Sequence, residues 1–386
     1  MRVLLAIAML VLMLVACTRE KSQSEHRPLT RIDSVGLVEI GRKEFSLDST
    51  TSYQTLLMSV YRSELDNKRY LVYENRANQT VQFYDFDTGL LWRELKYTRE
   101  GPNGVGKLRG FYVHTLDSIY LMSSKYYQFI LVDGSGNVLK RYPLIDRGTQ
   151  IADWSLPAIY TSTSAFLRDG RFYFVAFPES MPIEKQKPIL TLNLADSSCR
   201  LRYRFPDSYQ QGNTWGMLTG EVSVTETYEG SFLYSFASDP YLYETNDHQA
   251  EWKHFAGSRF FNETQPWDKG VGLGAEEAFV TRNYFLGIGY DRFREVYYRF
   301  THLALPTRNT RNEKNSIWNK PMSVIILSKN FKIIGETLLD MDKYDFRNWL
   351  VVEEGLLICN SNQHNPEVEE GKLKFTLFTL KVLNGK

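Results

Sequence analysis

The chain has 386 residues, in which 46 lysines and arginines face 45 aspartates and glutamates. This balance argues against a protein built to bind nucleic acid or an anionic membrane surface, because both tasks need a clustered basic excess. After the N-terminus, no segment approaches the roughly 20 consecutive apolar residues that a membrane-spanning helix requires.

The first seventeen residues predict an export signal. Arg2 precedes an apolar run over residues 3–16, which ends on Leu14-Val15-Ala16-Cys17. A short basic start, an apolar stretch without a polar face and small residues before a cysteine are typical of bacterial lipoprotein signals. We therefore predict a signal peptide at residues 1–16, lipidation of Cys17, and attachment to the cell envelope through its acyl chains, with the protein on the periplasmic or surface side of the outer membrane. The alternatives are a plain signal peptide without lipidation and a buried helix.

Residues 17–34 are polar and lack periodicity, which predicts a flexible tether. From residue 35 to residue 386 the chain consists of short runs rich in aromatic and β-branched residues, separated by Asp, Asn and Gly turns. This pattern predicts a single all-β domain.

One apolar tetrad recurs six times in that domain, and a second apolar run follows each copy. The copies lie 49 to 72 residues apart, at residues 70–73, 119–122, 172–175, 232–235, 284–287 and 356–359. Repeats of about 40 to 60 residues that each supply a small antiparallel sheet are typical of β-propellers. We therefore predict a six-bladed β-propeller of four-stranded antiparallel blades.

The two ends of the domain predict how the ring closes. The last repeat has only three apolar runs and lacks an outer strand, whereas residues 35–47 form a strand-like piece without a partner. Pairing this N-terminal piece with the C-terminal blade removes two exposed sheet edges. The longest interval, before the last tetrad, is assigned to an insertion at residues 306–320, whose basic residues, Lys320 among them, predict a solvated loop.

Four segments carry a resemblance to a known family. They are the signal ending at Cys17, Val81-Gln-Phe-Tyr-Asp-Phe-Asp-Thr-Gly89, Arg99-Glu-Gly-Pro-Asn-Gly-Val-Gly106 and Val296-Tyr-Tyr-Arg-Phe300. The chain resembles the six-bladed β-propeller lipoproteins of Bacteroides-like bacteria, and most of all the domain of unknown function 4221 family. The resemblance implies the fold over nearly the whole mature chain and brings no catalytic residues with it.

Motifs for catalysis, metals and cofactors are weak. Residues 101–107 have the glycine and lysine spacing of a phosphate-binding loop, but Leu108 stands where a hydroxyl is needed and a strand follows in place of a helix. The six histidines form no ligand cluster and no nucleophile elbow is present. We therefore predict no catalytic residue, metal or cofactor. Cys199 and Cys359 are predicted as two separate strand thiols, with a bridge between them left open.

Four of the seven tryptophans fall in or beside the connections between repeats: Trp154, Trp215, Trp267 and Trp349. In a propeller these connections meet around one mouth of the central channel. One interpretation is that each indole packs between neighbouring blades, as buried tryptophans commonly do. The other is an exposed aromatic platform for a ligand, with Arg259 and Arg347 supplying polar contacts.

These observations favour a lipid-anchored binding or scaffold protein that presents one face of the ring to a glycan, a peptide or another envelope protein. The alternative is a carbohydrate-active hydrolase or lyase with its site at the channel mouth, formed by carboxylates converging from different blades. Because a fold by itself implies no activity, the binding role is the preferred prediction.

Overall fold

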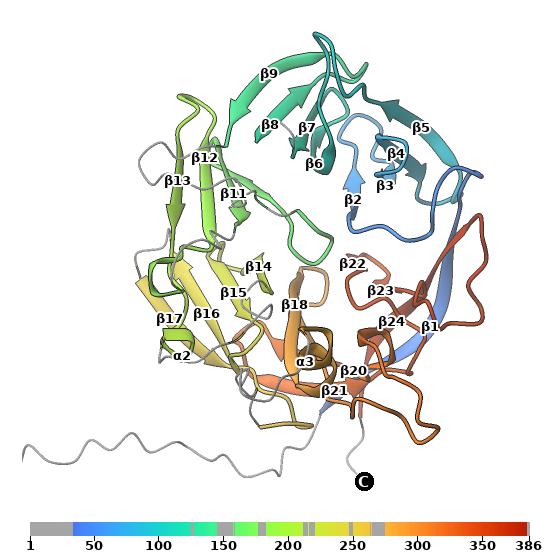
Figure 1. Cartoon of the computed structure of the whole chain (residues 1–386), viewed down its shortest axis with the longest axis vertical. Coiled ribbons are helices and arrows are strands. Elements are labelled where there is room, and N and C mark those ends of the chain that lie inside the picture. Colours follow the sequence, from blue (N-terminus) through green and yellow to red (C-terminus); the bar gives the residue numbers. More distant parts are fainter. Residues whose placement is uncertain are drawn as a thin grey trace, which may run out of the picture. The chain divides into compact units, whose positions relative to one another are not determined.

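The computed structural model describes residues 34–383 except 125–126, 145–156, 158, 177–182, 211–214, 216–220, 247–249, 263 and 265–274. These residues form six four-stranded antiparallel sheets, arranged as blades around one axis (Figure 1). This confirms the predicted six-bladed ring. No helix in the described part of the chain is long and apolar enough to cross a membrane.

In each blade the strands follow one another from the centre of the ring outward. Blade 1 is β2 (Met58–Arg62), β3 (Arg69–Asn75), β4 (Thr80–Asp85) and β5 (Leu91–Lys96), and blade 2 is β6 (Leu108–Thr115), β7 (Ser118–Ser123), β8 (Gln128–Val132) and β9 (Val138–Pro143). Blade 3 is β10 (Phe166–Arg168), β11 (Arg171–Val175), β12 (Ile189–Asn193) and β13 (Cys199–Arg202), and blade 4 is β14 (Val222–Glu226), β15 (Phe232–Phe236), β16 (Tyr241–Asn246) and β17 (Ala250–Phe255). Blade 5 is β18 (Tyr284–Asp291), β19 (Val296–His302), β20 (Met322–Ser328) and β21 (Ile333–Leu338), and blade 6 is β22 (Trp349–Val352), β23 (Gly355–Cys359), β24 (Lys372–Val382) and β1 (Val35–Ser46). Short helices η1 (Ile183–Lys185), α2 (Asp207–Gln210), α3 (Ala275–Thr281) and η4 (Ile317–Asn319) lie in the connections.

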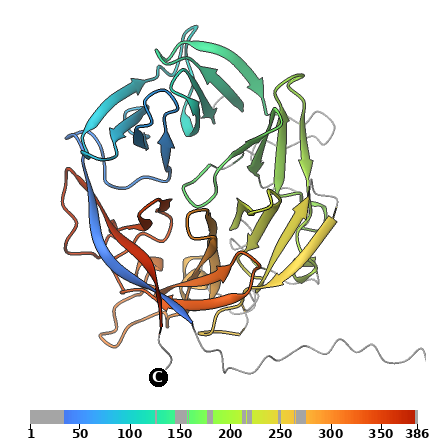
Figure 2. The ribbon, with the colours of Figure 1, turned by 180° about the vertical axis from the view of Figure 1, so that it is seen from behind.

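The N-terminal strand closes the ring, as the sequence predicts. β1 pairs antiparallel with β24 from Val35 opposite Val382 to Ser46 opposite Lys372, with one irregularity after Glu39. The two strands lie side by side along the outside of blade 6 in both views (Figures 1 and 2). The first and last strands of the domain therefore belong to the same sheet.

Phe45 extends this closure to the neighbouring blade. Its ring is 1% exposed and meets Phe375 of blade 6 edge-on, with centroids 5.9 Å apart. It also meets Phe86 and Tyr84, which belong to blade 1 and its edge, at 5.7 and 6.3 Å. Edge-to-face aromatic packing thus joins the last blade to the first.

Five of the six tetrads lie on the second strand of their blades, but residues 284–287 lie on β18, the innermost strand of blade 5. The second strand there is β19, which the sequence pattern does not assign to this blade. Arg299 interrupts its apolar run, and this arginine is fully buried because its guanidinium donates hydrogen bonds to Ser235 Oγ and to four backbone carbonyls. The long interval before the last tetrad therefore arises partly from this shift of one strand.

The prediction of a solvated loop at residues 306–320 is wrong at its last residue. Lys320 is only 4% exposed, and its ammonium donates hydrogen bonds to the carbonyls of Phe279, Val280 and Arg282 around the end of α3. Burial lowers the pKa of Lys320, while the three carbonyl acceptors favour the charged form that donates to them. The loop is thus fastened to blade 5, since three carbonyl acceptors and the Tyr284 ring, 4.5 Å away, compensate the buried amine.

A hairpin occupies the centre of the ring. Residues 159–165, termed the axial hairpin, precede β10 and reach into the middle of the molecule (Figures 1 and 2). Thr161 Oγ1 donates a hydrogen bond to Asn348 Oδ1 of blade 6 at 2.8 Å, and Ser223 Oγ of blade 4 donates one to the carbonyl of Ser162 at 2.6 Å. Met58 of blade 1 donates its backbone N–H to Thr161 Oγ1. The axial hairpin therefore links blades that are distant in sequence.

The two described cysteines are separate buried thiols, which confirms the sequence prediction. Cys199 packs with the residues of blades 2 and 3, whereas Cys359 packs in a cluster formed by blades 1 and 6. Burial and the nearby Asp345 carboxylate raise the pKa of Cys359 to about 12, so this thiol stays protonated at neutral pH.

Replacing Phe45 by alanine should weaken the closed ring. The change leaves a cavity where two blades meet, so the free energy of unfolding should fall by about 3–5 kcal/mol. Denaturant unfolding followed by circular dichroism measures the loss. Arg42→Ala in the same strand is the control, because Arg42 is largely exposed and should change stability by no more than about 0.5 kcal/mol. Equal stability of the two variants would show that this contact does not support closure.

Candidate ligand-binding site

The four predicted tryptophans do not share one environment. Trp154 and Trp267 lie outside the described residues, whereas Trp215 and Trp349 are 7% and 6% exposed. The Trp349 indole stacks on Phe300 of blade 5, with centroids 4.7 Å apart, and fills the space over a glycine of β18, where an added Cβ at Gly289 would come within 2.5 Å of it. For Trp215 and Trp349, this burial favours the packing interpretation over an exposed platform.

The two predicted arginines lie beside different strands. Arg259 donates its backbone N–H and one guanidinium hydrogen to Glu336 of β21, the outermost strand of blade 5. Arg347 lies just before β22, the innermost strand of blade 6. The two arginines therefore contact different residues and do not form one site. Of the two, Arg347 lines a hollow beside blades 1 and 6.

That hollow, termed the mouth pocket, has a volume of about 280 Å³. It lies at the end of the ring where the chain enters the innermost strands of blades 6 and 1. The lining residues come from the segment before β2, from the end of β3 and its following turn, and from blade 6: Ser52, Gln54, Thr55, Leu56, Tyr73, Glu74, Asn75, Arg76, Ala77 and Arg347. Two of the connections that enter innermost strands, those before β2 and β22, contribute to this lining.

Glu74 and Arg76 form an incompletely satisfied pair in this lining. Arg76 Nε donates to Glu74 Oε2 at 2.7 Å, and the Glu74 side chain is fully buried. Glu74 Oε1 and Arg76 Nη2 are both buried without a hydrogen-bond partner. Burial raises the pKa of Glu74, while the positive charges of Arg76 and Arg109 oppose that rise. The pair thus leaves one acceptor and one donor unused.

Arg347 is held by a buried polar network. Its Nε and Nη2 donate to the two carboxylate oxygens of Asp345 at 3.2 and 3.3 Å. Asn348 donates to the same carboxylate and to the carbonyl of Thr55, and accepts from Thr161 of the axial hairpin. Because Asp345 and Asn348 are fully buried and bonded on several sides, Arg347 has a fixed orientation.

An aromatic side chain that the sequence pattern does not single out lies beside Arg347. The half-buried Trp318 of η4 lies under the Arg347 guanidinium, 4.6 Å from it, and packs against Phe346. This tryptophan belongs to the insertion, for which the sequence predicts a solvent-exposed loop. The insertion packs against the blades through long-range contacts such as those of Lys320, and no local sequence pattern predicts such contacts.

The sequence analysis does not identify Glu74 as a candidate site residue, although the alternation of residues along β3 predicts that its side chain is buried. Tyr70, Val72 and Glu74 alternate along β3 and so share one face of the strand. Since Tyr70 and Val72 belong to the apolar tetrad, period two places the carboxylate of Glu74 on a buried face. A buried carboxylate at the end of a central strand is a candidate for function.

The mouth pocket suits binding through hydrogen bonds. A hydroxyl group both donates and accepts, so it complements an unused carboxylate oxygen beside an unused guanidinium N–H. Within the described residues, no three His, Cys, Asp or Glu side chains gather in a way that could hold a metal ion.

Six four-stranded blades, closed by the N-terminal strand and hollowed at one mouth, define a six-bladed β-propeller. The chain belongs to the family described as domain of unknown function (DUF4221), which matches residues 34–338. It is similar to the crystal structure of a DUF4221 member from Bacteroides vulgatus, with 22% identity and a TM-score of 0.77 over 92% of this chain and 100% of that one. It is also similar to a Bacteroides fragilis protein named "Putative exported protein", with 11% identity and a TM-score of 0.51 over 92% and 98%. No curated protein matches the sequence. At these identities the structural likeness shows the fold.

Replacing Trp349 by alanine should separate packing from ligand contact. Loss of the indole between blades 5 and 6 should lower the free energy of unfolding by about 3–5 kcal/mol. The half-buried Trp318 provides the comparison, and Trp318→Ala should cost about 1 kcal/mol. Denaturant unfolding of both variants measures the difference, and the same measurement on Trp154→Ala and Trp267→Ala decides between packing and exposure for those two. A Trp349→Ala protein as stable as the wild type would contradict the packing interpretation for Trp349 and favour a role in ligand contact.

Proposed function

We propose that this protein is a lipid-anchored binding or scaffold protein of the cell envelope, and that its mouth pocket takes a hydroxyl-rich ligand, namely a saccharide unit of a glycan. The observation that carries the proposal is the buried pair of Glu74 and Arg76, with one unused acceptor and one unused donor. The lipoprotein-type signal that ends on Leu14-Val15-Ala16-Cys17 supports the anchor.

Energetics support a ligand of this kind. Each buried polar group without a partner costs about 1–3 kcal/mol, so a hydroxyl that reaches Glu74 Oε1 and Arg76 Nη2 through a small adjustment of these side chains would offset part of that cost. A volume of about 280 Å³ lies at the small end of ligand sites, which suits one sugar ring. Arg347, which lines the pocket and is oriented by Asp345, then offers a fixed donor beside the ring.

A binding role is favoured over a hydrolase or lyase by the content of the pocket. Glycoside hydrolysis usually takes two carboxyl groups on either side of the scissile bond. Among the described residues that line the mouth pocket, Glu74 is the single carboxylate, and it is already bonded to Arg76. This arrangement provides hydrogen bonds for recognition and lacks an acid and base pair.

Substitution of Cys17 tests the anchor. Cys17→Ala removes the thiol that would carry the lipid, so the protein should move from the membrane fraction to the soluble fraction of the envelope. Immunoblots of the two fractions measure the shift, with Cys199→Ala as the control because that thiol is buried in the domain. Identical partition of Cys17→Ala and wild-type protein would exclude lipid anchoring at this residue.

A glycan array tests the mouth pocket, because saccharides bound by the wild-type protein identify the ligand. Glu74→Gln exchanges the unused carboxylate oxygen for a neutral amide and should weaken such binding about tenfold or more, as expected for a hydrogen bond to a charged group. Ala77→Trp, at an exposed lining position, should block the hollow without disturbing the core.

Leu65→Trp is the matched control for Ala77→Trp. Leu65 is 87% exposed and lies in the turn at the opposite end of β3, so this variant should bind as the wild type does. If Ala77→Trp binds as well as Leu65→Trp does, the ligand uses another surface. Peptides that bind in place of saccharides on a parallel peptide array would shift the ligand class to peptides.

A further inference from the structure

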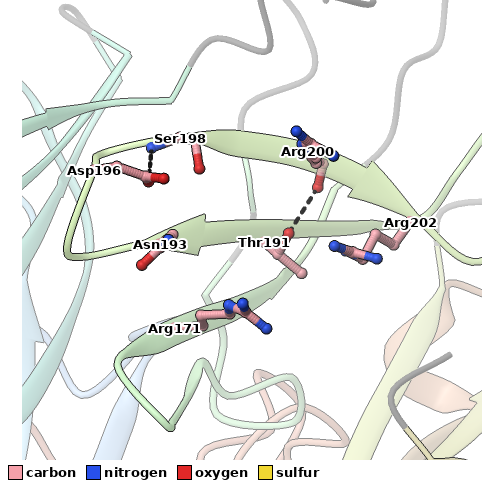
Figure 3. A pocket seen from close by; sticks show the side chains of 7 residues that line it. All are labelled: Arg171, Thr191, Asn193, Asp196, Ser198, Arg200 and Arg202. Atoms are coloured by element: carbon pink, nitrogen blue, oxygen red, sulfur yellow. Dashed lines mark hydrogen bonds between the residues drawn. The ribbon is translucent and has the colours of Figure 1, made fainter.

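A second hollow lies on blade 3, remote in the fold from the mouth pocket of blades 1 and 6. It has a volume of about 230 Å³, and its lining comes from β11, β12, β13 and the turn between β12 and β13: Arg171, Thr191, Asn193, Asp196, Ser198, Arg200 and Arg202. Figure 3 shows Arg171 and Arg202 on either side of Thr191, with Arg200 next to it on β13. We call this site the arginine hollow.

The three arginines are unpaired within the part of the chain that the structure describes. There, none of their guanidinium groups forms an ion pair or a hydrogen bond, or lies over an aromatic ring. Cations on other outer strands do have such partners. Arg141 of β9 bonds to two carbonyls of the neighbouring connection, and Lys253 of β17 lies 5.2 Å from the Tyr243 ring.

The only carboxylate in the lining does not neutralise these charges. Asp196 accepts the backbone N–H of Ser198 at 2.9 Å, within the turn that both residues form. Hydrogen bonds from Ser198 lower the pKa of Asp196, so it remains ionised at neutral pH. Three guanidinium groups against one carboxylate leave the lining with two net positive charges.

Protection of the sheet edge explains part of this arrangement but not all of it. β13 is the outer strand of blade 3, and charged residues on outer strands discourage pairing with other chains. Arg171, however, belongs to β11, the second strand from the axis. Like charges gathered on one face repel each other, so the convergence of Arg171 with Arg200 and Arg202 is favourable when an anion lies between them.

We propose that the arginine hollow binds a phosphate monoester. Such a group carries about −1.5 to −2 charges at neutral pH, which matches the two net positive charges of the lining. Guanidinium groups bind phosphate oxygens through pairs of parallel hydrogen bonds. The volume holds the phosphate and about one sugar ring. A phosphorylated sugar in solution and a phosphomonoester headgroup on a lipid both present this chemistry.

Calorimetric titration of the purified protein with glucose 6-phosphate tests the site. Arg171→Gln combined with Arg202→Gln should weaken binding by about tenfold or more, because two charge-assisted contacts are lost. Arg204→Gln is the matched control. Arg204 is two residues beyond Arg202, 67% exposed and 3.8 Å from Asp207, so its loss should leave the affinity within about twofold of wild type.

Two further ligands make the test decisive. Glucose 6-sulfate, a monoanion, should bind more weakly than glucose 6-phosphate. Flotation with phosphatidylcholine vesicles, with or without phosphatidic acid, separates the two sources: binding to phosphatidic acid alone identifies a lipid headgroup, and binding to the sugar phosphate alone identifies a soluble ligand. Absence of binding to either, equal affinity for the sulfate, or equal loss in Arg204→Gln would overturn the proposal. Unchanged melting temperatures establish that the variants are folded.

Discussion

Pairing of β1 with β24 is the contact on which the ring depends. A row of six sheets without this pairing would leave unpaired strand edges at blade 6, and Phe45 would lose its contacts with both blade 6 and blade 1. The mouth pocket lies at this same junction, because its lining combines the entrance to β2 with Arg347 from the segment before β22. The mouth pocket therefore lies between the two blades that the closed ring brings together.

The axial hairpin has a related role at the centre. Propeller blades contact mainly their neighbours, yet Thr161 and Ser162 bond to blades 6, 1 and 4. Asn348 carries this connection to Asp345, which orients Arg347. Since nearly every polar group of this network has a partner, it holds Arg347 in place before a ligand arrives, which reduces the entropy lost on binding. Glu74 Oε1 and Arg76 Nη2 differ from these groups, because each is buried without a hydrogen-bond partner.

The sequence predicts the fold well because repeats and turns are local signals. Five tetrads lie where the repeat places them, and the unpartnered strand at residues 35–47 finds its blade. The failures occur where long-range contacts override local patterns. The sequence pattern does not predict β19, because Arg299 interrupts its apolar run. The five hydrogen bonds that allow Arg299 to be buried go to residues 43 to 64 positions away in the sequence. The prediction of a solvated Lys320 fails for the same reason. At the candidate site, Arg347 is identified from its position in a connection, whereas the partnership of Glu74 with Arg76 depends on burial that the sequence only hints at.

The overall charge balance limits the kinds of surface that the protein can have, but it does not predict local clusters of charge. Nearly equal numbers of acidic and basic residues argue against a broad basic surface, because such a surface usually comes with an excess of basic residues. They do not prevent three arginines from gathering in one small hollow while their counter-charges pair elsewhere, as Arg69 does with Asp87 and Glu354. The two sites consequently differ in how they would respond to salt. In these proposals, binding at the mouth pocket would rest on buried, short-range hydrogen bonds, which salt screens little, whereas binding in the exposed arginine hollow would rest on charge and would weaken as ionic strength rises. One neutral protein can therefore carry one site of each kind, and salt dependence distinguishes which of them a given ligand occupies.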